Sequence, residues 1–80
     1  MVTIRLFGPI RENCGQGKIS VDAGSVRDVM AQAIQHGVDR KLFGEALMFV
    51  NGQAVVGAKR WKVKLKDGDE LALLSPVSGG

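Results

Sequence analysis

The last two residues, Gly79 and Gly80, are the part of this sequence best suited to chemistry. Glycine makes up about 7% of residues in proteins, so two final glycines arise by chance in about 0.5% of chains. A free carboxylate is a poor electrophile, but adenylation converts it into a mixed anhydride that sulfur or an amine can attack. The activating enzyme must pass this carboxylate through a narrow channel to the α-phosphate of ATP, and glycine, which lacks a Cβ, fits such a channel. The pair therefore predicts a terminus that is activated at Gly80.

The segment before the two glycines predicts an extended tail. Residues 75–80 directly follow the last predicted strand, and Pro76 favours extended backbone at and before its own position. The alternative is a frayed or engineered end without a function. We favour a folded domain over residues 1–74 and a flexible carrier tail over residues 75–80. We expect the tail to be mobile in the free protein, because it has few apolar groups to bury.

Other reactive side chains are scarce. The chain has one cysteine, Cys14, and one histidine, His36, so it has no Cys/His cluster with metal-ligand spacing. We interpret Cys14 as an incidental thiol and His36 as a residue that supports a helix dipole. No glycine-rich phosphate loop with the required lysine is present. The chain is therefore expected to bind no metal and to lack a complete active site of its own.

The bulk composition is that of an ordinary globular protein. The 80 residues suffice for one domain, near the lower limit for a chain that buries its own core. The longest apolar runs, such as residues 46–50, are far too short to cross a bilayer, and no signal-peptide pattern opens the chain. A single cysteine excludes an internal disulfide framework and fits a reducing compartment. These features predict a cytoplasmic protein without a membrane partner.

The chain is basic, with a net charge of +3 and a pI of about 9.4. Much of the excess lies in residues 59–66, where basic and apolar residues alternate. This alternation predicts a strand with Trp61, Val63 and Leu65 on its core face and the basic residues on the other face. We favour a solvated outer face over a binding site for an acidic partner. Trp61 is interpreted as a core residue rather than a stacking platform, and no nucleic-acid partner is expected.

The clearest element is a helix that begins at Ser25. Ser25 and Asp28 form a Ser-x-x-Asp capping box, and the apolar residues that follow have helical spacing. Gly37, free to take a left-handed conformation, ends the helix. Strands are expected over residues 2–7, 18–21, 46–50, 59–66 and 70–74, with a brief strand over 53–56. A tight turn is expected at Asn51-Gly52, a loop over 8–17 and a short polar segment with one helical turn over 38–45.

This order of elements predicts an α+β domain in which one main helix packs across a mixed sheet. If the first and last strands lie side by side, the fold is a β-grasp of the ubiquitin-like type with a C-terminal tail. Phe7 and Leu74 fall on the strand faces opposite the core and, with Val77, are expected to form an apolar docking patch or a second core layer. The expected core comprises Ile4, Leu6, Val29, Met30, Ile34, Leu47, Phe49, Val63, Leu65 and Leu73.

Four segments carry a resemblance to a known family. They are Ile10-Arg11-Glu12 with Gly15, Val50-Asn51-Gly52, Lys66-Asp67-Gly68-Asp69-Glu70 and Ser75-Pro76-Val77-Ser78-Gly79-Gly80. With them the whole chain resembles the MoaD/ThiS family of ubiquitin-like sulfur carriers, and its ending is closer to MoaD, the molybdopterin synthase small subunit, than to the thiamine branch, ThiS. Ser75 stands where many members have a second proline, which should loosen the tail. The basic segment is also more positive than is typical of the family.

The resemblance implies that an E1-like, MoeB-like enzyme uses ATP to adenylate Gly80, which then becomes a thiocarboxylate. It also implies that the sulfur passes to a pterin precursor in a MoaE-like large subunit, with Pro76, Val77 and Ser78 in contact with the partner and no stably bound cofactor in this chain. Three alternatives remain: a ThiS-type thiamine carrier, a protein modifier that forms isopeptide bonds through Gly80, and a basic interaction module. High-mass conjugates would mark the modifier, and salt-sensitive binding that survives removal of the tail would mark the module.

Overall fold

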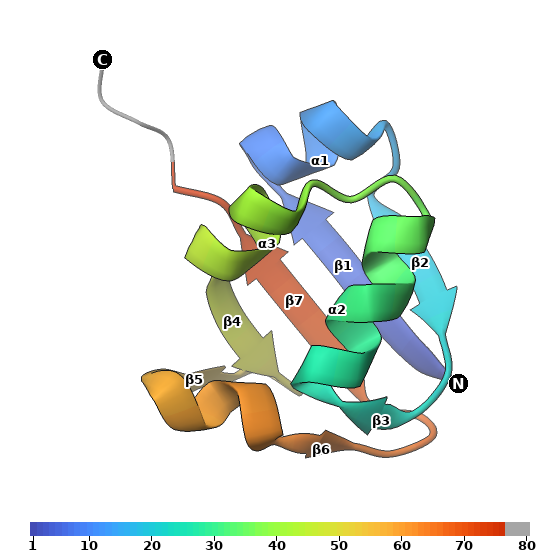
Figure 1. The fold of residues 1–80 in the computed structure, drawn as a ribbon, viewed down its shortest axis with the longest axis vertical. Coiled ribbons are helices and arrows are strands. Elements are labelled where there is room, and N and C mark those ends of the chain that lie inside the picture. Colours follow the sequence, from blue (N-terminus) through green and yellow to red (C-terminus); the bar gives the residue numbers. More distant parts are fainter. Residues whose placement is uncertain (77–80) are drawn as a thin grey trace.

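The computed structural model describes residues 1–76, and residues 77–80 lie outside the described part. Within it, a five-stranded mixed sheet has the order β2-β1-β7-β4-β5 (Figure 1). The strands are β1 (Val2–Phe7), β2 (Lys18–Val21), β4 (Leu47–Val50), β5 (Gln53–Val55) and β7 (Glu70–Leu74), while β3 (Gly24–Ser25) pairs with β6 (Lys64–Leu65) beside the sheet. The first and last strands lie side by side and parallel, and the other pairs are antiparallel. This arrangement confirms the predicted β-grasp.

The helices of the described part are α1 (Pro9–Cys14), α2 (Val26–Gln35), α3 (Arg40–Glu45) and the 3-10 helix η1 (Ala58–Lys62). The longest, α2, crosses one face of the sheet in front of β1 and β7 (Figure 1). The opposite face of the sheet, called here the outer face, carries none of these helices. The outer face is therefore the surface on which exposed strand residues can meet a partner.

The predicted capping box at the start of α2 is confirmed. The Asp28 N–H donates to the Ser25 hydroxyl oxygen and the Ser25 N–H donates to the Asp28 carboxylate, each at 3.1 Å. The bonds from Ser25 hold the pKa of the Asp28 carboxyl below its ordinary value, because they favour the charged form. At the other end of the helix Gly37 has a φ of 97°, as the sequence indicated.

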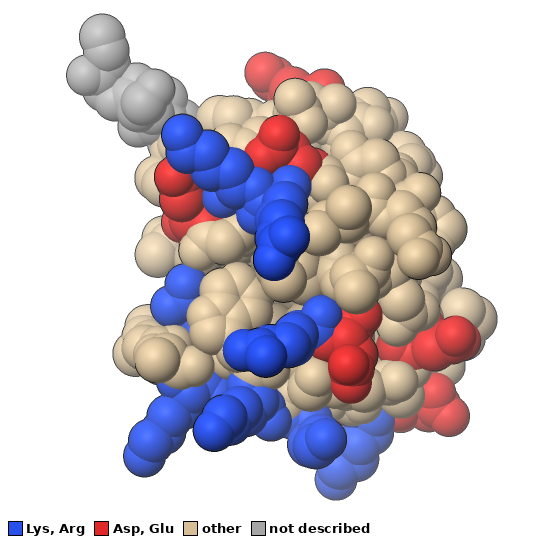
Figure 2. Space-filling view, viewed as in Figure 1, with Lys and Arg blue, Asp and Glu red and all other residues tan. Residues whose placement is uncertain are grey.

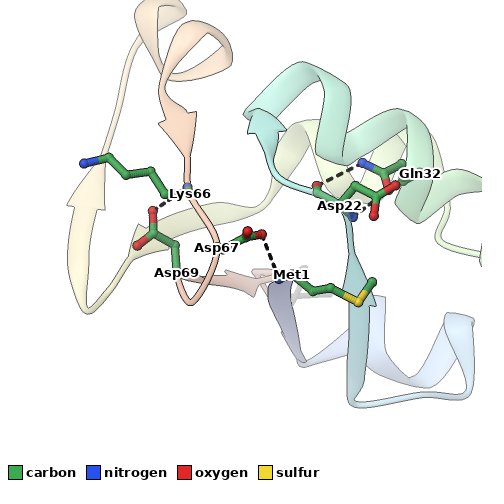
Figure 3. A network of polar contacts seen from close by, with 6 residues as sticks. All are labelled: Met1, Asp22, Gln32, Lys66, Asp67 and Asp69. Carbon is green, nitrogen blue, oxygen red and sulfur yellow. Dashed lines mark hydrogen bonds and ion pairs between the residues drawn. The ribbon is translucent and has the colours of Figure 1, made fainter.

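Hydrogen bonds connect the β4–β5 turn with the turn before β7, close to the N-terminus. The Met1 ammonium group binds the Asp67 carboxylate at 2.8 Å, and the Lys66 N–H donates to the Asp69 carboxylate at 2.8 Å (Figure 3). Asn51 in the β4–β5 turn donates to Asp69 at 3.0 Å and accepts from the Glu70 N–H at 2.9 Å. The segments Val50-Asn51-Gly52 and Lys66–Glu70 thus form one polar cluster that fixes where β7 begins.

A second pair of bonds connects α2 to the loop after β2. The Asp22 N–H donates to the Gln32 side-chain oxygen at 2.8 Å, and the Gln32 amide donates back to the Asp22 carbonyl at 3.1 Å (Figure 3). This reciprocal contact sets the position of α2 across the sheet, so that its apolar side faces β1 and β7.

The core lies between α2 and the sheet. Its buried apolar residues are Val2, Ile4, Leu6, Ile10, Ile19, Val21, Val26, Val29, Ala33, Val38, Phe43, Ala46, Met48, Leu65, Leu71 and Leu73. Among the residues expected there, Met30 and Val63 are half-buried and pack against the core. Ile34 is half-buried outside this cluster, because α2 presents Val29 and the small Ala33 to the sheet. The expectation that Ile34 belongs to the core is wrong.

The prediction of which β4 residues point into the core is also wrong. Met48 pairs with Leu73 and is buried, whereas Leu47 is 51% exposed and Phe49 is only half-buried. Every residue from 46 to 50 is apolar, so the sequence gives no alternation from which to choose the inward positions. The strand therefore places Leu47 and Phe49 on the outer face.

Two segments differ from the expected elements. Residues 9–14, expected to be loop, form α1, where Pro9 occupies the first turn and Ile10 is buried. Residues 59–66, expected to be one strand, form η1 followed by the two-residue β6. In η1 the ring of Trp61 stacks on Phe43 with centroids 6.2 Å apart, so a tertiary contact overrides the local alternation.

The two isoleucines Ile4 and Ile34 provide a matched test of this core. Ile4 is fully buried in β1, so Ile4→Ala should lower the free energy of unfolding by about 2–5 kcal/mol. Ile34→Ala removes the same atoms from a half-buried site and should cost clearly less. Urea denaturation followed by circular dichroism measures both. Equal losses in the two variants would contradict the orientation of α2 described above.

Candidate functional site: the tail base and the outer sheet face

The chain leaves the sheet at Ser75, directly after the central strand β7. Ser75 is 2% exposed, and its N–H donates to the Phe7 carbonyl at 3.1 Å. A proline in this position has no N–H and cannot make that bond. Ser75 itself is held in place because it continues the pairing of β7 with β1, whereas the expected loosening concerns a tail whose residues 77–80 lie outside the described part.

Gly8 allows the chain after β1 to lie close to Ser75. Its φ is 80°, in the left-handed region, and a Cβ at Gly8 would lie 2.8 Å from the Ser75 carbonyl oxygen. Any other residue would therefore be strained and would also push against Ser75. Gly8 was not among the predicted site residues, although a Gly-Pro pair directly after a strand is a recognisable signal of a sharp change in direction.

A hollow of about 390 Å³ lies where the tail begins. It is bordered by Pro9 of α1 on one side and by α3 on the other, and Ser75 and Pro76 form part of its wall. Its α3 side carries Asp39, Lys41, Leu42 and Glu45. Pro76, a predicted partner-binding residue, is exposed at this position. The fold thus presents the start of the tail between α1 and α3.

A row of apolar side chains crosses the outer face of the sheet beside the tail. Leu74 pairs with Phe7 on one side and with Leu47 on the other, so the three occupy one row across β1, β7 and β4. Their exposures are 42% for Phe7, 40% for Leu74 and 51% for Leu47. In the next row half-buried Ala72 pairs with half-buried Phe49 on one side and with Arg5 on the other, and Arg5 forms an ion pair with Glu70. We call Phe7, Leu47 and Leu74 the apolar row.

The exposure of Phe7 and Leu74 agrees with an outer patch rather than a second core layer. Leu47 was missed because it had been assigned to the core. The remaining residues predicted for the site, Val77, Ser78, Gly79 and Gly80, lie outside the described residues.

Within residues 1–76, the two other candidate reactive side chains, Cys14 and His36, do not form a joint site. Cys14 is half-buried, and its thiol donates to the backbone carbonyl of His36 at 3.9 Å. Residues 1–76 contain no group of three or more His, Cys, Asp or Glu residues placed to hold a metal ion. In the same part of the chain, no helix is both long and apolar enough to cross a membrane.

A mixed sheet crossed by one helix, with its central strand leading directly into the C-terminal segment, defines a ubiquitin-like β-grasp protein. The ThiS family model matches residues 4–80, and the chain belongs to this family of ubiquitin-like sulfur carriers. No curated protein matches the chain in a sequence search.

Several solved structures are similar over nearly the whole length. Small archaeal modifier protein 1 from Methanosarcina acetivorans is 26% identical, with a TM-score of 0.82 over 99% of this chain and 95% of the other. A chain in the complex of subunits 1 and 2 of molybdopterin-converting factor from Helicobacter pylori is 27% identical, with a TM-score of 0.65 over 99% and 97%. The BexX/CysO complex of Amycolatopsis orientalis contains a chain that shares the fold at 21% identity, with a TM-score of 0.79 over 100% of both chains.

Proposed function

We propose that this protein carries sulfur as a thiocarboxylate on Gly80. The observation that carries the proposal is that the ThiS family model matches through residue 80, so that Gly79 and Gly80 fall within the match. The geometry supports it, because β7 leads out of the sheet at Ser75 and the tail therefore begins beside an exposed apolar row. An E1-like enzyme binds the domain through this row and receives the tail in its nucleotide site.

The reaction uses the C-terminal carboxylate as the only reacting group of this chain. A Gly80 carboxylate oxygen attacks the α-phosphate of ATP, which releases pyrophosphate and forms the acyl adenylate. Hydrosulfide then attacks the Gly80 carbonyl carbon, the bond to the AMP oxygen breaks, and the thiocarboxylate and AMP are formed with loss of a proton. ATP is bound by the activating enzyme, so this chain needs no bound cofactor of its own. Gly79 lets the backbone enter the enzyme channel without a Cβ.

We further propose that the sulfur is used in molybdopterin synthesis, with this chain as the small subunit beside a MoaE-like large subunit. Support comes from the Pro76–Gly80 ending and from the similarity to a chain of the molybdopterin-converting factor complex. Catalysis of sulfur transfer then belongs to the large subunit. The tail residues Pro76, Val77 and Ser78 contact the partners along the path to the reacting carbonyl. A cytoplasmic location fits this use of ATP and reduced sulfur.

A second candidate function is protein modification. The chain is similar over 99% of its length to small archaeal modifier protein 1. In that case a substrate lysine attacks the Gly80 adenylate or a thioester derived from it, and an isopeptide bond forms. High-mass conjugates in extracts that contain the intact chain but not a chain lacking Gly80 would favour the modifier over the carrier.

The direct test uses the full-length chain with an E1-like enzyme, ATP and sulfide. We expect the intact mass to rise by the difference between sulfur and oxygen, and only when ATP is present. Fragmentation should place the change in the C-terminal peptide. Adding the thiocarboxylated chain to a MoaE-like subunit and a pterin precursor should then regenerate the carboxylate and yield a dithiolene product. An unchanged mass after activation would overturn the carrier proposal. Activation without transfer to the pterin would overturn only the molybdopterin branch.

A further inference from the structure

Basic side chains gather at the end of the molecule where η1 and β6 lie (Figure 2). They come from α2, η1 and β6 and include Arg27, Lys59, Lys62 and Lys64. Each of these four is exposed, and within residues 1–76 none of them forms an ion pair. Unpaired basic side chains in one region make that region attractive to an acidic partner.

Trp61 lies among these basic residues and is only half-buried. A hollow of about 360 Å³ is lined by Trp61 with Arg27, Met30 and Arg40. Another of about 320 Å³ is lined by Trp61 with Ser25, Arg27, Lys62 and Lys64. Trp61 and Arg27 border both hollows, so the surface combines an aromatic ring with basic walls. We call Arg27, Arg40, Trp61, Lys62 and Lys64 the Trp61 surface.

Arg60 connects Trp61 to neighbouring backbone groups and so holds the Trp61 surface in place. Its guanidinium donates to the carbonyl of Gly44 at 3.0 Å and to that of Gly57 at 3.2 Å, and it lies 4.8 Å from the centre of the Trp61 ring. The ring of Phe43 stacks on Trp61. Trp61 is therefore fixed to α3 and the core, so a ligand meets an ordered ring and does not have to immobilise it.

The charges favour a peptide over a nucleic acid as the occupant. Asp28 is exposed and lies near Arg27 and Lys64 as part of the α2 cap, so one negative charge interrupts the basic region. A nucleic acid backbone carries a charge at every nucleotide and would be repelled there. A peptide can place separate carboxylates against Arg27 and Lys62 while an apolar side chain covers Trp61 and Met30. Arginine is also suited to binding a carboxylate through two parallel hydrogen bonds.

We propose that the Trp61 surface binds an acidic segment of a partner protein in which Asp or Glu residues flank an apolar side chain. The surface lies on the α2 side of the sheet, because η1 packs against α2, while the apolar row lies on the outer face. The two surfaces can therefore be occupied at the same time. This interaction goes beyond the carrier function and does not require the tail.

The test uses the full-length protein and a synthetic peptide rich in Asp and Glu with a central phenylalanine. Trp61 is the single tryptophan of the chain, so its fluorescence reports binding directly. We expect saturable binding that weakens as the salt concentration rises. Binding should be lost when Asn and Gln replace the Asp and Glu residues of the peptide. Arg27→Glu should weaken binding about tenfold or more, because it removes a charge-assisted contact and adds repulsion.

The matched control is Lys18→Glu, which makes the same change of charge at an exposed position on β2. It should leave binding nearly unchanged. Lys62→Glu provides a second variant if Arg27→Glu disturbs α2, and circular dichroism checks that each is folded. Equal weakening by Lys18→Glu and the two surface variants would overturn the proposal, because binding would then follow net charge alone. Failure of the acidic peptide to bind, or tighter binding of a single-stranded oligonucleotide than of the peptide, would overturn it as well.

Discussion

Adding one alanine after Gly80 should abolish formation of the thiocarboxylate and leave the stability of the domain unchanged. The reacting carboxylate must reach the α-phosphate of ATP through a channel of fixed length, so an additional residue carries it past the reacting position. The new terminal residue also brings a methyl group where glycine has no side chain. Because Ser75 and the core are untouched, the urea midpoint should equal that of the parent. Intact mass after incubation with an E1-like enzyme, ATP and sulfide measures the result.

Removing Gly80 should have the same effect for the opposite reason, since the carboxylate then falls short of the nucleotide. The matched control is Cys14→Ser, which removes the one thiol of the chain and should leave activation intact. This control separates sulfur carried on the terminus from sulfur attached to a cysteine. If the alanine-extended chain is thiocarboxylated as efficiently as the parent, Gly80 is not the required end and the carrier proposal fails.

Local patterns predicted the elements whose signals lie within a few residues. The capping box at Ser25 and Asp28 fixes the start of α2, and Asn51-Gly52 fixes the β4–β5 turn, where both residues have positive φ. Alternation along β1 identified Ile4 and Leu6 as buried and placed Phe7 on the opposite face of the strand. These features depend on short-range sterics and hydrogen bonds, so the sequence alone contains enough information to locate them.

The predictions are wrong where tertiary contacts determine the local structure. In β4, only the pairing of Met48 with Leu73 selects the inward side of an all-apolar strand. In residues 59–66, the stacking of Trp61 on Phe43 and the bonds of Arg60 favour a 3-10 turn over the strand that alternation predicts. For the site, alternation placed Phe7 and Leu74 on the strand faces opposite the core, but Leu47 could not be found without the order of the sheet. The roles of Val77 to Gly80 stay predictions.

Leu74→Asp should weaken binding of the activating enzyme strongly while the domain remains folded. Leu74 is the middle member of the apolar row, between Phe7 and Leu47, and we expect it to be a hot spot, a residue whose loss costs about 2 kcal/mol or more of binding free energy. A carboxylate there must be desolvated against an apolar partner, so the dissociation constant should rise about 30-fold or more. The side chain is 40% exposed in the free protein, so an aspartate can be solvated without opening the core. Calorimetric titration against the E1-like enzyme measures the change.

Two control positions show whether the effect belongs to the apolar row. Ser20→Asp adds the same charge at an exposed position on β2, where Ser20 pairs with Thr3 away from the row, and it should bind the enzyme nearly as the parent does. Leu73→Asp, one residue before Leu74 but fully buried, should unfold the domain because its charge would enter the core. Leu74→Asp should resemble Ser20→Asp in its circular dichroism spectrum and differ from it in affinity. Unfolding of Leu74→Asp would assign Leu74 to the core, and unchanged affinity would show that the enzyme does not dock on this face of the sheet.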